Sequence, residues 1–352
     1  MNSSELLFFG LFIVFVVSFL LLDLGVLDKK NHLVSFKEAI TYTCLWITVS
    51  ICFYVFLLYH GEWLHLGAHS GLPELKELIV RYGHPINIDG LDYEAALKVY
   101  RHNLGLEYIT GYVIEKMLSM DNIFVMIMIF YAFNVNPLYY RRVLFWGILA
   151  AIVFRFAFIF SASALIHQFK WVLYLFGLLL IYTGVKMLFE KDSHEKINTM
   201  NHPVVRFASR RLPVYPRFVQ HHFFVRQSGK WLITPLLIVL MVIEFSDVIF
   251  AVDSIPAIFA VTSDPYIIFF SNVFAILGLR ALFFIIIKII DLFRFLKIGL
   301  SVLLTFIGIK MLIPDFLRSL GFTTAHSLYV ILGVMLIAIL FSVLFPEKKE
   351  TN

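Results

Sequence analysis

Charged residues and cysteines are scarce in this sequence. Of its 352 residues, 15% are charged and 60% are hydrophobic, whereas about a quarter of the residues in a soluble domain are charged. The two cysteines, Cys44 and Cys52, are eight positions apart in one apolar run, which separates them by about 12 Å along a helix. A disulfide cannot bridge that distance. The composition therefore excludes an ordinary soluble domain, a disulfide framework and a thiolate metal site.

Recognisable catalytic motifs are also missing. The sequence has no phosphate-binding glycine loop, no HExxH or GxSxG motif and no haem-attachment motif. We therefore expect that the protein is not an enzyme and has no resident cofactor. The net charge of +5 is expected to sit in cytoplasmic loops and does not indicate nucleic-acid binding.

Long apolar runs dominate the sequence instead. Nine of them are long enough to cross about 30 Å of hydrocarbon as helices. The first is expected to be retained, because MNSSELLFF lacks the basic start of a signal peptide. The sequence thus predicts an all-α, polytopic membrane protein, a single transmembrane domain over residues 1–352 with about nine helices. Their ranges are 5–27, 39–59, 105–133, 142–166, 170–189, 232–260, 266–290, 295–313 and 326–345.

Basic residues are concentrated in every second loop between these helices. The stretch 191–230 carries eight Lys or Arg against two Asp or Glu, whereas 61–104 carries four against six. Under the positive-inside rule this alternation predicts an outer N-terminus and a cytoplasmic C-terminus in the inner (plasma) membrane. The lipid bilayer is therefore the first expected partner, and the sequence leaves the oligomeric state open.

The two long loops carry weaker signals. In the outer loop 61–104, we expect a helical run at Asp92–Arg101, and His60, His65 and His69 could gather metal at its mouth. In the basic cytoplasmic loop 190–230, Phe223–Thr234 is typical of a hairpin that turns at Ser228–Gly229.

The chain repeats itself over about 105–189 and about 232–313. Each unit has two acids six residues apart, then a small polar residue, then an arginine, and a GxKML motif 28 or 29 residues after it. Each unit contains three predicted helices, so the second is inverted relative to the first, as in many transporters that hold substrate near the midplane. The matched pairs are Glu115 with Asp247, Asp121 with Asp253, Asn122 with Ser254, Arg155 with Arg280 and Gly184 with Gly308.

Five acids lie well inside the third and sixth predicted helices. A charge at mid-bilayer costs at least about 2.5–3.5 kcal/mol, so these side chains need counter-charges. Arg155 and Arg280 can supply part of the balance, and protons or bound cations would supply the rest. For any single acid, a structural salt bridge to one of these arginines is an equally simple explanation. The acids are Glu115, Asp121, Glu244, Asp247 and Asp253.

Helical spacing places several of these acids on one face with polar neighbours. The second acid of each repeat, Asp121 or Asp253, projects about a third of a turn away. Pro256 lacks a backbone N–H, which predicts a break in the sixth helix near Val252 and free carbonyl oxygens there. Asn272, in the seventh helix, is a further candidate ligand. The residues that share a face are Glu115 with Ser119 and Asn122, and Glu244 with Asp247 and Ser254.

These side chains offer carboxylate, amide and hydroxyl oxygens. Oxygen ligands suit Mg²⁺, Ca²⁺ or Mn²⁺, and we expect Mn²⁺ first because it tolerates a mixed shell. An oxyanion is disfavoured because the acids would repel it. The sequence predicts a metal site formed by Glu115, Asp121, Asn122, Glu244, Asp247, Asp253, Ser254 and Asn272, with Arg155 and Arg280 balancing the charge.

Three long motifs resemble the TerC family of integral membrane proteins. They are ITGYVIEKMLSMDN (Ile109–Asn122), IEFSDVIFAVDSIPAIFAVTSDP (Ile243–Pro265) and SNVFAILGLRALFF (Ser271–Phe284). The family takes its name from tellurium resistance, and the resemblance implies links to manganese efflux, pH response and metal loading of secreted enzymes. The acidic motif residues of the family carry over to Glu115, Asp121, Asn122, Glu244, Asp247 and Asp253.

Two functions follow as hypotheses. The first is a Mn²⁺ exporter that works by alternating access between the two inverted units, in exchange for protons. The second is a membrane partner for the assembly or metallation of other proteins, or for tellurium or pH stress resistance without direct transport. Transport depends on the acids, whereas the partner function depends on the loops 61–104 and 190–230.

Overall fold

The computed structural model describes residues 3–27, 34–66, 71–189, 202–220, 222–227, 229–289 and 295–344. Most of these residues are helical. The helices are α1 (Ser3–Leu27), α2 (Phe36–His60), η1 (Gly61–Leu64), α3 (Leu72–Tyr82), α4 (Tyr93–Ala132), α5 (Pro137–Gln168), α6 (Trp171–Phe189), α7 (Pro203–Arg211), α8 (Pro235–Phe259), α9 (Pro265–Leu277), α10 (Leu279–Ile289), α11 (Leu296–Leu312), α12 (Pro314–Ser319) and α13 (Thr324–Leu344).

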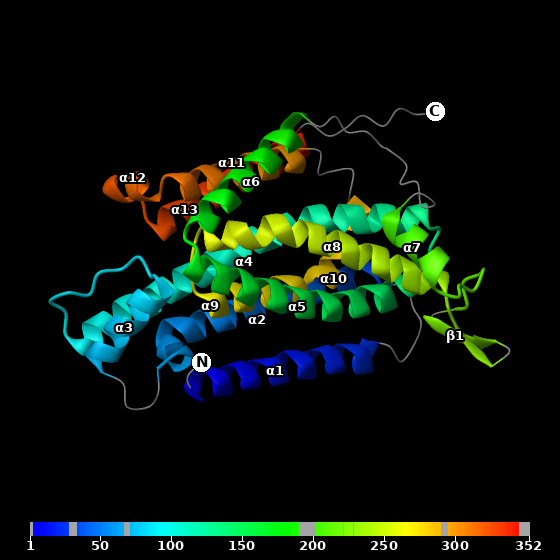
Figure 1. The fold of residues 1–352 in the computed structure, drawn as a ribbon, viewed down its shortest axis with the longest axis horizontal. Coiled ribbons are helices and arrows are strands. Elements are labelled where there is room, and N and C mark those ends of the chain that lie inside the picture. Colours follow the sequence, from blue (N-terminus) through cyan, green and yellow to red (C-terminus); the bar gives the residue numbers. More distant parts are fainter. Residues whose placement is uncertain are drawn as a thin grey trace.

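The long helices form one bundle (Figure 1). Helices α1, α2, α4, α5, α8 and the α9–α10 pair run along a common direction, while α6, α11 and α13 form a group on one flank. Helix α3 lies at one end of the bundle and α7 lies at the other. The two long loops therefore lie at opposite ends, which agrees with their predicted placement on opposite sides of a membrane.

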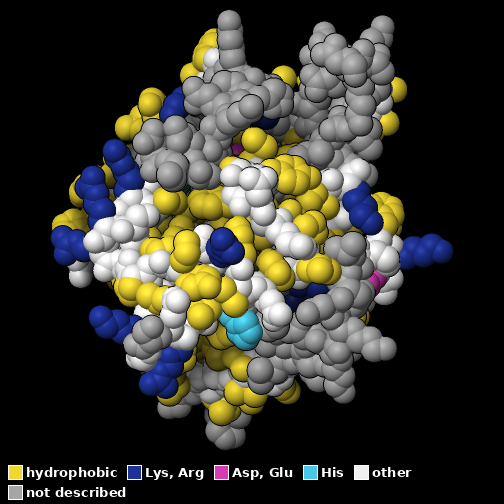
Figure 2. Space-filling model, turned by 90° about the vertical axis from the view of Figure 1, so that its right-hand side faces the viewer, with side chains coloured by type: hydrophobic (Ala, Val, Ile, Leu, Met, Phe, Trp, Pro, Cys, Tyr) yellow, Lys and Arg dark blue, Asp and Glu magenta, His cyan; other side chains and the backbone are white. Residues whose placement is uncertain are grey.

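The end that carries α7 is rich in basic side chains. Figure 2 shows Lys and Arg spread over this face among apolar side chains, with few acids in view. Arg206, Arg210 and Arg211 of α7 are all exposed. The positive-inside rule associates such a face with the cytoplasm, and the orientation of the chain stays a prediction.

Apolar length supports a polytopic membrane protein. Among the described residues, five helices are long and apolar enough to cross a membrane, or six if α9 and α10, bent by 45°, count as one span. Helices occupy all nine of the predicted ranges, but not all of them meet that test. The all-α polytopic class is therefore confirmed, whereas the count of nine spans and the inverted repeat stay predictions.

Helix α4 is longer than predicted. It runs for 40 residues, which is about 60 Å and about twice the thickness of the hydrocarbon layer. Asp92 caps its start by accepting a hydrogen bond from the backbone N–H of Ala95, 2.8 Å away. The helical run expected at Asp92–Arg101 is thus the first part of α4, and the outer connection is shorter than residues 61–104.

The predicted break near Val252 is wrong. Helix α8 continues through Pro256 to Phe259. Pro256 cannot donate to the carbonyl of Val252, but α8 continues for three more residues, so the loss of one hydrogen bond does not end the helix.

The bend falls instead at Gly278, between α9 and α10. The Lys116 ammonium of α4 donates a 3.1 Å hydrogen bond to the carbonyl of Ala275 beside the bend, as cations commonly do at helix C-termini. A Cβ at Gly278 would lie 2.8 Å from Lys116 Nζ. Glycine at this position therefore lets the lysine reach the exposed carbonyls.

The expected hairpin in the basic loop is confirmed. Strand β1 (Phe224–Gln227) pairs antiparallel with β2 (Lys230–Ile233), and Gly229 has a positive φ of 78°, which glycine adopts readily. Residue 228 of the predicted turn lies outside the described residues.

Helices α6 and α11 pack closely through small residues. A Cβ on Gly308 would lie 2.7 Å from the carbonyl oxygen of Gly177, and one on Gly184 would lie 2.5 Å from Thr305 Oγ1. The Ser301 hydroxyl also donates to the carbonyl of Gly184. Small residues and interhelical hydrogen bonds are the usual basis of helix association in lipid. Gly184 and Gly308 are matched positions of the predicted repeat.

We expect Gly308→Val to disrupt this pairing. The added side chain cannot fit against the α6 backbone, so the unfolding free energy should fall by about 1–3 kcal/mol or more. Thermal unfolding of the purified protein measures the change. Gly333→Val in α13 is the matched control, because a Cβ there meets nothing within 4 Å. Equal losses in the two variants would contradict close α6–α11 packing.

Candidate functional site

Arg155 of α5 lies at the meeting point of four helices and is fully buried. Its Nη1 donates to Glu115 Oε1 of α4 and to Asn272 Oδ1 of α9, and its Nη2 lies 3.2 Å from Asp247 Oδ1 of α8. A buried guanidinium requires such compensation. Arg155 therefore pairs with two of the acids that the sequence singled out, and its single positive charge balances one of their two negative charges.

Further polar side chains complete this central cluster. Ser119 Oγ donates to Glu115 Oε1 over 3.0 Å, and Asn122 Nδ2 lies 3.3 Å from Asp247 Oδ1. Glu115, Ser119 and Asn122 project from one face of α4, as their spacing predicts. The structure thus brings one predicted ligand from α9, one from α8 and two from α4 around a single arginine.

Several buried atoms of this region have no protein partner. They are Glu115 Oε2, Arg155 Nε, Asn272 Nδ2 and Ser254 Oγ. Because buried polar atoms are almost always hydrogen-bonded, each of these atoms has an unused hydrogen-bonding capacity. The two oxygens, Glu115 Oε2 and Ser254 Oγ, could accept a hydrogen bond from water or contact a cation, whereas the two nitrogens, Arg155 Nε and Asn272 Nδ2, can only donate.

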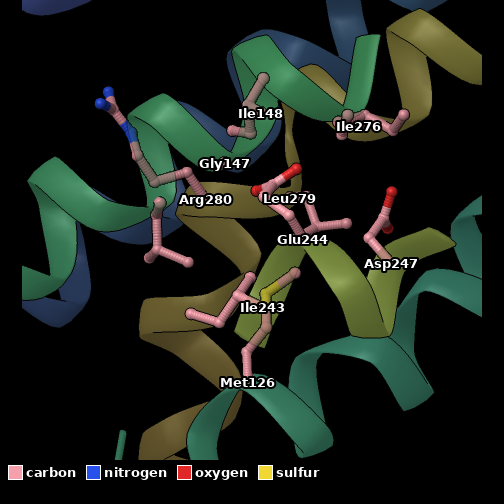
Figure 3. A pocket seen from close by; sticks show the side chains of 11 residues that line it. Met126, Gly147, Ile148, Ile243, Glu244, Asp247, Ile276, Leu279 and Arg280 are labelled. Carbon is pink, nitrogen blue, oxygen red and sulfur yellow. The ribbon is translucent and has the colours of Figure 1, made fainter. Parts of the chain in front are cut away.

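A small cavity lies beside the cluster. It has a volume of about 20 Å³ and is lined by Glu244, Asp247 and Arg280 among apolar residues, as Figure 3 shows. This space can hold one water molecule. A Cβ added at Gly147 would lie 3.0 Å from Glu244 Oε1, so any larger residue at this position would crowd Glu244.

Glu244 also lines a larger groove on the flank of the molecule. The groove has a volume of about 580 Å³, lies between α5, α7 and α8, and is walled by apolar side chains such as Phe154 and Phe207. Glu244 therefore separates this groove from the inner cavity, and its buried Oε2 has no protein partner.

Two predicted ligands lie elsewhere. Asp253 accepts a 3.1 Å hydrogen bond from Thr183 Oγ1 of α6. Asp121 follows Glu115 by six positions, which turns it about a third of a turn away from the α4 face that contacts Arg155. Both side chains are half-buried. A site that used all five acids at once would need a different conformation.

The second arginine does not mirror the first. In Figure 3 the guanidinium of Arg280 extends away from Glu244 and Asp247, and Arg280 also lines a second small cavity that includes Glu38. The matched arginines of the predicted repeat therefore have different surroundings. In the described part of the chain, no three His, Cys, Asp or Glu side chains are spaced to hold a metal ion in this conformation.

Comparison with known proteins identifies the family. A model of the integral membrane protein TerC family matches residues 100–350. The chain belongs to the TerC family. No solved structure matches the chain at a significant level.

Full-length relatives of this TerC-family protein are membrane proteins. It is 42% identical over 345 residues to Alx of Salmonella typhi, which is named as a candidate membrane-bound redox modulator, with 98% of this chain and 96% of the relative covered. It is 41% identical over 341 residues to an uncharacterized membrane protein of Myxococcus xanthus, with 97% and 93% covered. Alx of Escherichia coli (strain K12) is 39% identical over 337 residues, with 96% and 94% covered.

A second buried polar network lies at the α3 end of the bundle, and the sequence analysis did not identify it as a unit. His65, considered there as a loop histidine, lies 2.9 Å through Nε2 from Asp264 and 3.3 Å through Nδ1 from Glu5. His60 is exposed and its ring lies tilted against that of Trp63, and His69 lies outside the described residues. Of the two described histidines, His65 therefore contacts acids and does not share a metal site with His60.

Glu107 of α4 is the other centre of this α3-end network. His84 Nδ1 lies 3.0 Å from Glu107 Oε2, Asn103 Nδ2 donates to Oε1 over 2.7 Å, and Thr262 Oγ1 donates to Oε2 over 2.7 Å. Glu107 is fully buried. The sequence analysis did not select Glu107, because it lies in the polar start of the third predicted helix. Its spacing of eight residues from Glu115 could have indicated a second buried acid on the same helix.

We expect Arg155→Gln to destabilise the protein strongly. Removing the guanidinium leaves Glu115 and Asp247 buried without a counter-charge, which costs about 3–5 kcal/mol. The double variant Glu115→Gln/Arg155→Gln should recover part of that loss, because it buries one charge fewer. Thermal unfolding of the purified proteins measures both effects. A double variant less stable than Arg155→Gln alone would contradict the pairing.

Proposed function

We propose that this TerC-family protein moves a divalent metal cation across the membrane, with Mn²⁺ the first candidate and export the direction. The observation that carries the proposal is the central cluster itself. Two buried carboxylates and two side-chain amides surround a positive charge at the meeting point of four helices. Intramembrane ionisable groups of this kind mark ion pathways.

Arg155 acts in this proposal as the internal cation of the empty state. Its guanidinium contacts Glu115, Asp247 and Asn272, the same oxygens that would bind a metal ion. An entering cation would displace the guanidinium from these oxygens. The carboxylates would then have a positive partner both with and without the metal ion. This lowers the free-energy cost of the conformational change that returns the metal-free protein to its starting state.

The chemistry of the oxygens favours a hard or borderline ion. Carboxylates from Glu115 and Asp247 and amide oxygens from Asn122 and Asn272 suit Mn²⁺, Mg²⁺ or Ca²⁺ better than a thiophilic ion. Glu244, beside the small cavity, is placed to bind a proton or a hydrated ion next to this shell. Proton exchange at these acids would balance the charge that the metal carries.

The redox description of the Alx relatives suggests another activity. In this chain the two cysteines, Cys44 and Cys52, are both free and exposed on α2, about 12 Å apart along the helix. They cannot form a disulfide with each other. Redox exchange would therefore need a partner thiol, and we favour a link to redox balance through the metal that is moved.

We expect expression of the protein to lower cellular manganese in a manganese-sensitive bacterial host. Asp247→Asn removes one charged ligand, which corresponds to about 2 kcal/mol or about 30-fold weaker binding, so it should abolish the effect. Asp315→Asn, on exposed α12, should behave as the wild type. Elemental analysis of washed cells measures manganese, with membrane levels of each variant as the reference.

The same experiment distinguishes transport through the central cluster from the alternative function as a membrane partner of other proteins. If wild type and Asp247→Asn lower manganese equally, while removal of the β1–β2 hairpin abolishes the effect, the central cluster is not the transport site. The loops would then be the working surfaces. If cellular manganese is unchanged while the content of another metal falls, the central cluster remains the proposed transport site, and the transported ion is that other metal.

A further inference from the structure

The α3-end network is a continuous chain of hydrogen bonds. From Glu107 it passes to Thr262, whose hydroxyl accepts a 3.2 Å bond from the backbone N–H of Asp264. From Asp264 it passes through the two ring nitrogens of His65 to Glu5. Tyr82 Oη donates to Glu5 Oε1 over 2.7 Å. The chain therefore joins α1, the segment after η1, α3, α4 and the α8–α9 connection.

The position of His65 fixes the proton content of this chain. Each of its two ring nitrogens faces a carboxylate oxygen. A neutral imidazole has one N–H and can donate to only one carboxylate. Both contacts are favourable only if the ring is an imidazolium or if one carboxylate holds the proton. The geometry thus requires one proton beyond the neutral ring.

Burial makes that proton important. Glu5, His65 and Asp264 are each 2% exposed or less, so water cannot screen two carboxylates placed on either side of one ring. Without the proton, one ring nitrogen would present its lone pair to a carboxylate oxygen about 3 Å away. Two buried negative charges that share no positive counter-charge destabilise the contacts between the segments that carry them.

Other titratable groups surround the α3-end hydrogen-bond network. Glu62 and Arg101 pair with each other at 2.6 Å beside the η1 segment, so they add no net charge. The remaining groups that act on the network are Arg81 and Tyr82 of α3, His84 of the following loop, Tyr100 and Glu107 of α4, Tyr266 of α9 and Lys310 of α11.

We propose that Glu5, His65 and Asp264 form a proton-binding site, and that the bound proton holds the α3 end of the helix bundle closed. The three residues come from α1, from the segment after η1 and from the connection that starts α9. When the proton leaves, the two carboxylates no longer share a positive partner, and these segments separate. The site binds protons whichever ion the central cluster carries, so it goes beyond the transport proposal.

The direction of the pH effect follows from the pKa values outside the spans. Burial alone lowers the pKa of His65, but the charge of Asp264 and the hydrogen bonds to both acids raise it to about 9. A raised pKa stabilises the folded site fully below the ordinary value of 6.5, and the stabilisation is lost as pH rises through about 9. The pKa of Asp264 is lowered, despite its burial, by the charge of His65, so that acid changes only at low pH.

Cysteine accessibility tests the proposal directly. Ser263 is half-buried beside Asp264, and an added Cβ at Gly83 of the α3 end would lie 3.8 Å from it. We would place a cysteine there, Ser263→Cys, in a full-length protein carrying Cys44→Ser and Cys52→Ser. Alkylation by iodoacetamide would be followed in lipid nanodiscs from pH 6 to pH 10. A separate protein with a cysteine at an exposed position of α4, Glu94→Cys, gives the pH dependence of thiol reactivity itself. The alkylation rate of Ser263→Cys is divided by the rate of this reference at each pH.

We expect the normalised rate to be low and constant below about pH 6.5. Between about 6.5 and about 9 it should rise by up to about tenfold per pH unit, because each opening then releases one proton, and above about 9 it should level off. His65→Gln should move the rise to lower pH, since the amide cannot carry the proton. Glu5→Gln should keep the rate low up to pH 10, because a neutral imidazole can pair with the one remaining carboxylate.

The matched control is His102→Gln, which makes the same change at an exposed position of α4 and should behave as the parent. A flat normalised rate in the parent from pH 7 to pH 10 overturns the proposal. So does a Glu5→Gln variant that opens at the same pH as the parent, even if His65→Gln does not fold. Manganese export by the parent, measured separately, reports on the transport proposal alone.

Discussion

A charge buried in a membrane protein must be compensated where it lies, and this requirement organises the centre of the bundle. Arg155 is fully buried, and α4, α8 and α9 each contribute a side chain that contacts its guanidinium. Helix α9, buried along its whole length, brings Asn272 into this position. The packing of the four helices and the chemistry of the cluster therefore depend on the same contacts, so a cation that competes with Arg155 also acts on helix packing.

Helix α4 links the two polar regions of the molecule. Glu107 belongs to the α3-end network and Glu115 to the central cluster, and eight residues of continuous helix separate them by about 12 Å. The two regions differ in the source of the positive charge that compensates their acids. In the central cluster this charge is the permanent charge of Arg155, whereas in the α3-end network it is a proton that His65 can lose. An arginine keeps its charge at all physiological pH values, while a histidine does not, which suits the first region to compensation and the second to control by pH.

The sequence predicted much of the central cluster because helical spacing is local. Glu115 and Asn122 share a face by periodicity alone, and so do Asp247 and Ser254. It could not predict that Asn272 would contact Arg155, since that contact depends on how α5 packs on α9. The predicted break near Val252 was wrong because α8 tolerates the single hydrogen bond that Pro256 removes, and the bend lies instead at Gly278, between α9 and α10, where Lys116 donates to the carbonyl of Ala275.

The sequence by itself determined the class of the protein: its apolar runs require a membrane, and its buried acids require counter-charges, since both follow from the transfer energies of individual residues. Only the tertiary structure decided which charges meet. Arg155 reaches the acids whereas the guanidinium of its match, Arg280, points away from them, and His65, separated from Glu5 by 60 residues and from Asp264 by 199, bridges the two. Such contacts arise from helix packing over long separations, which residue order does not encode locally.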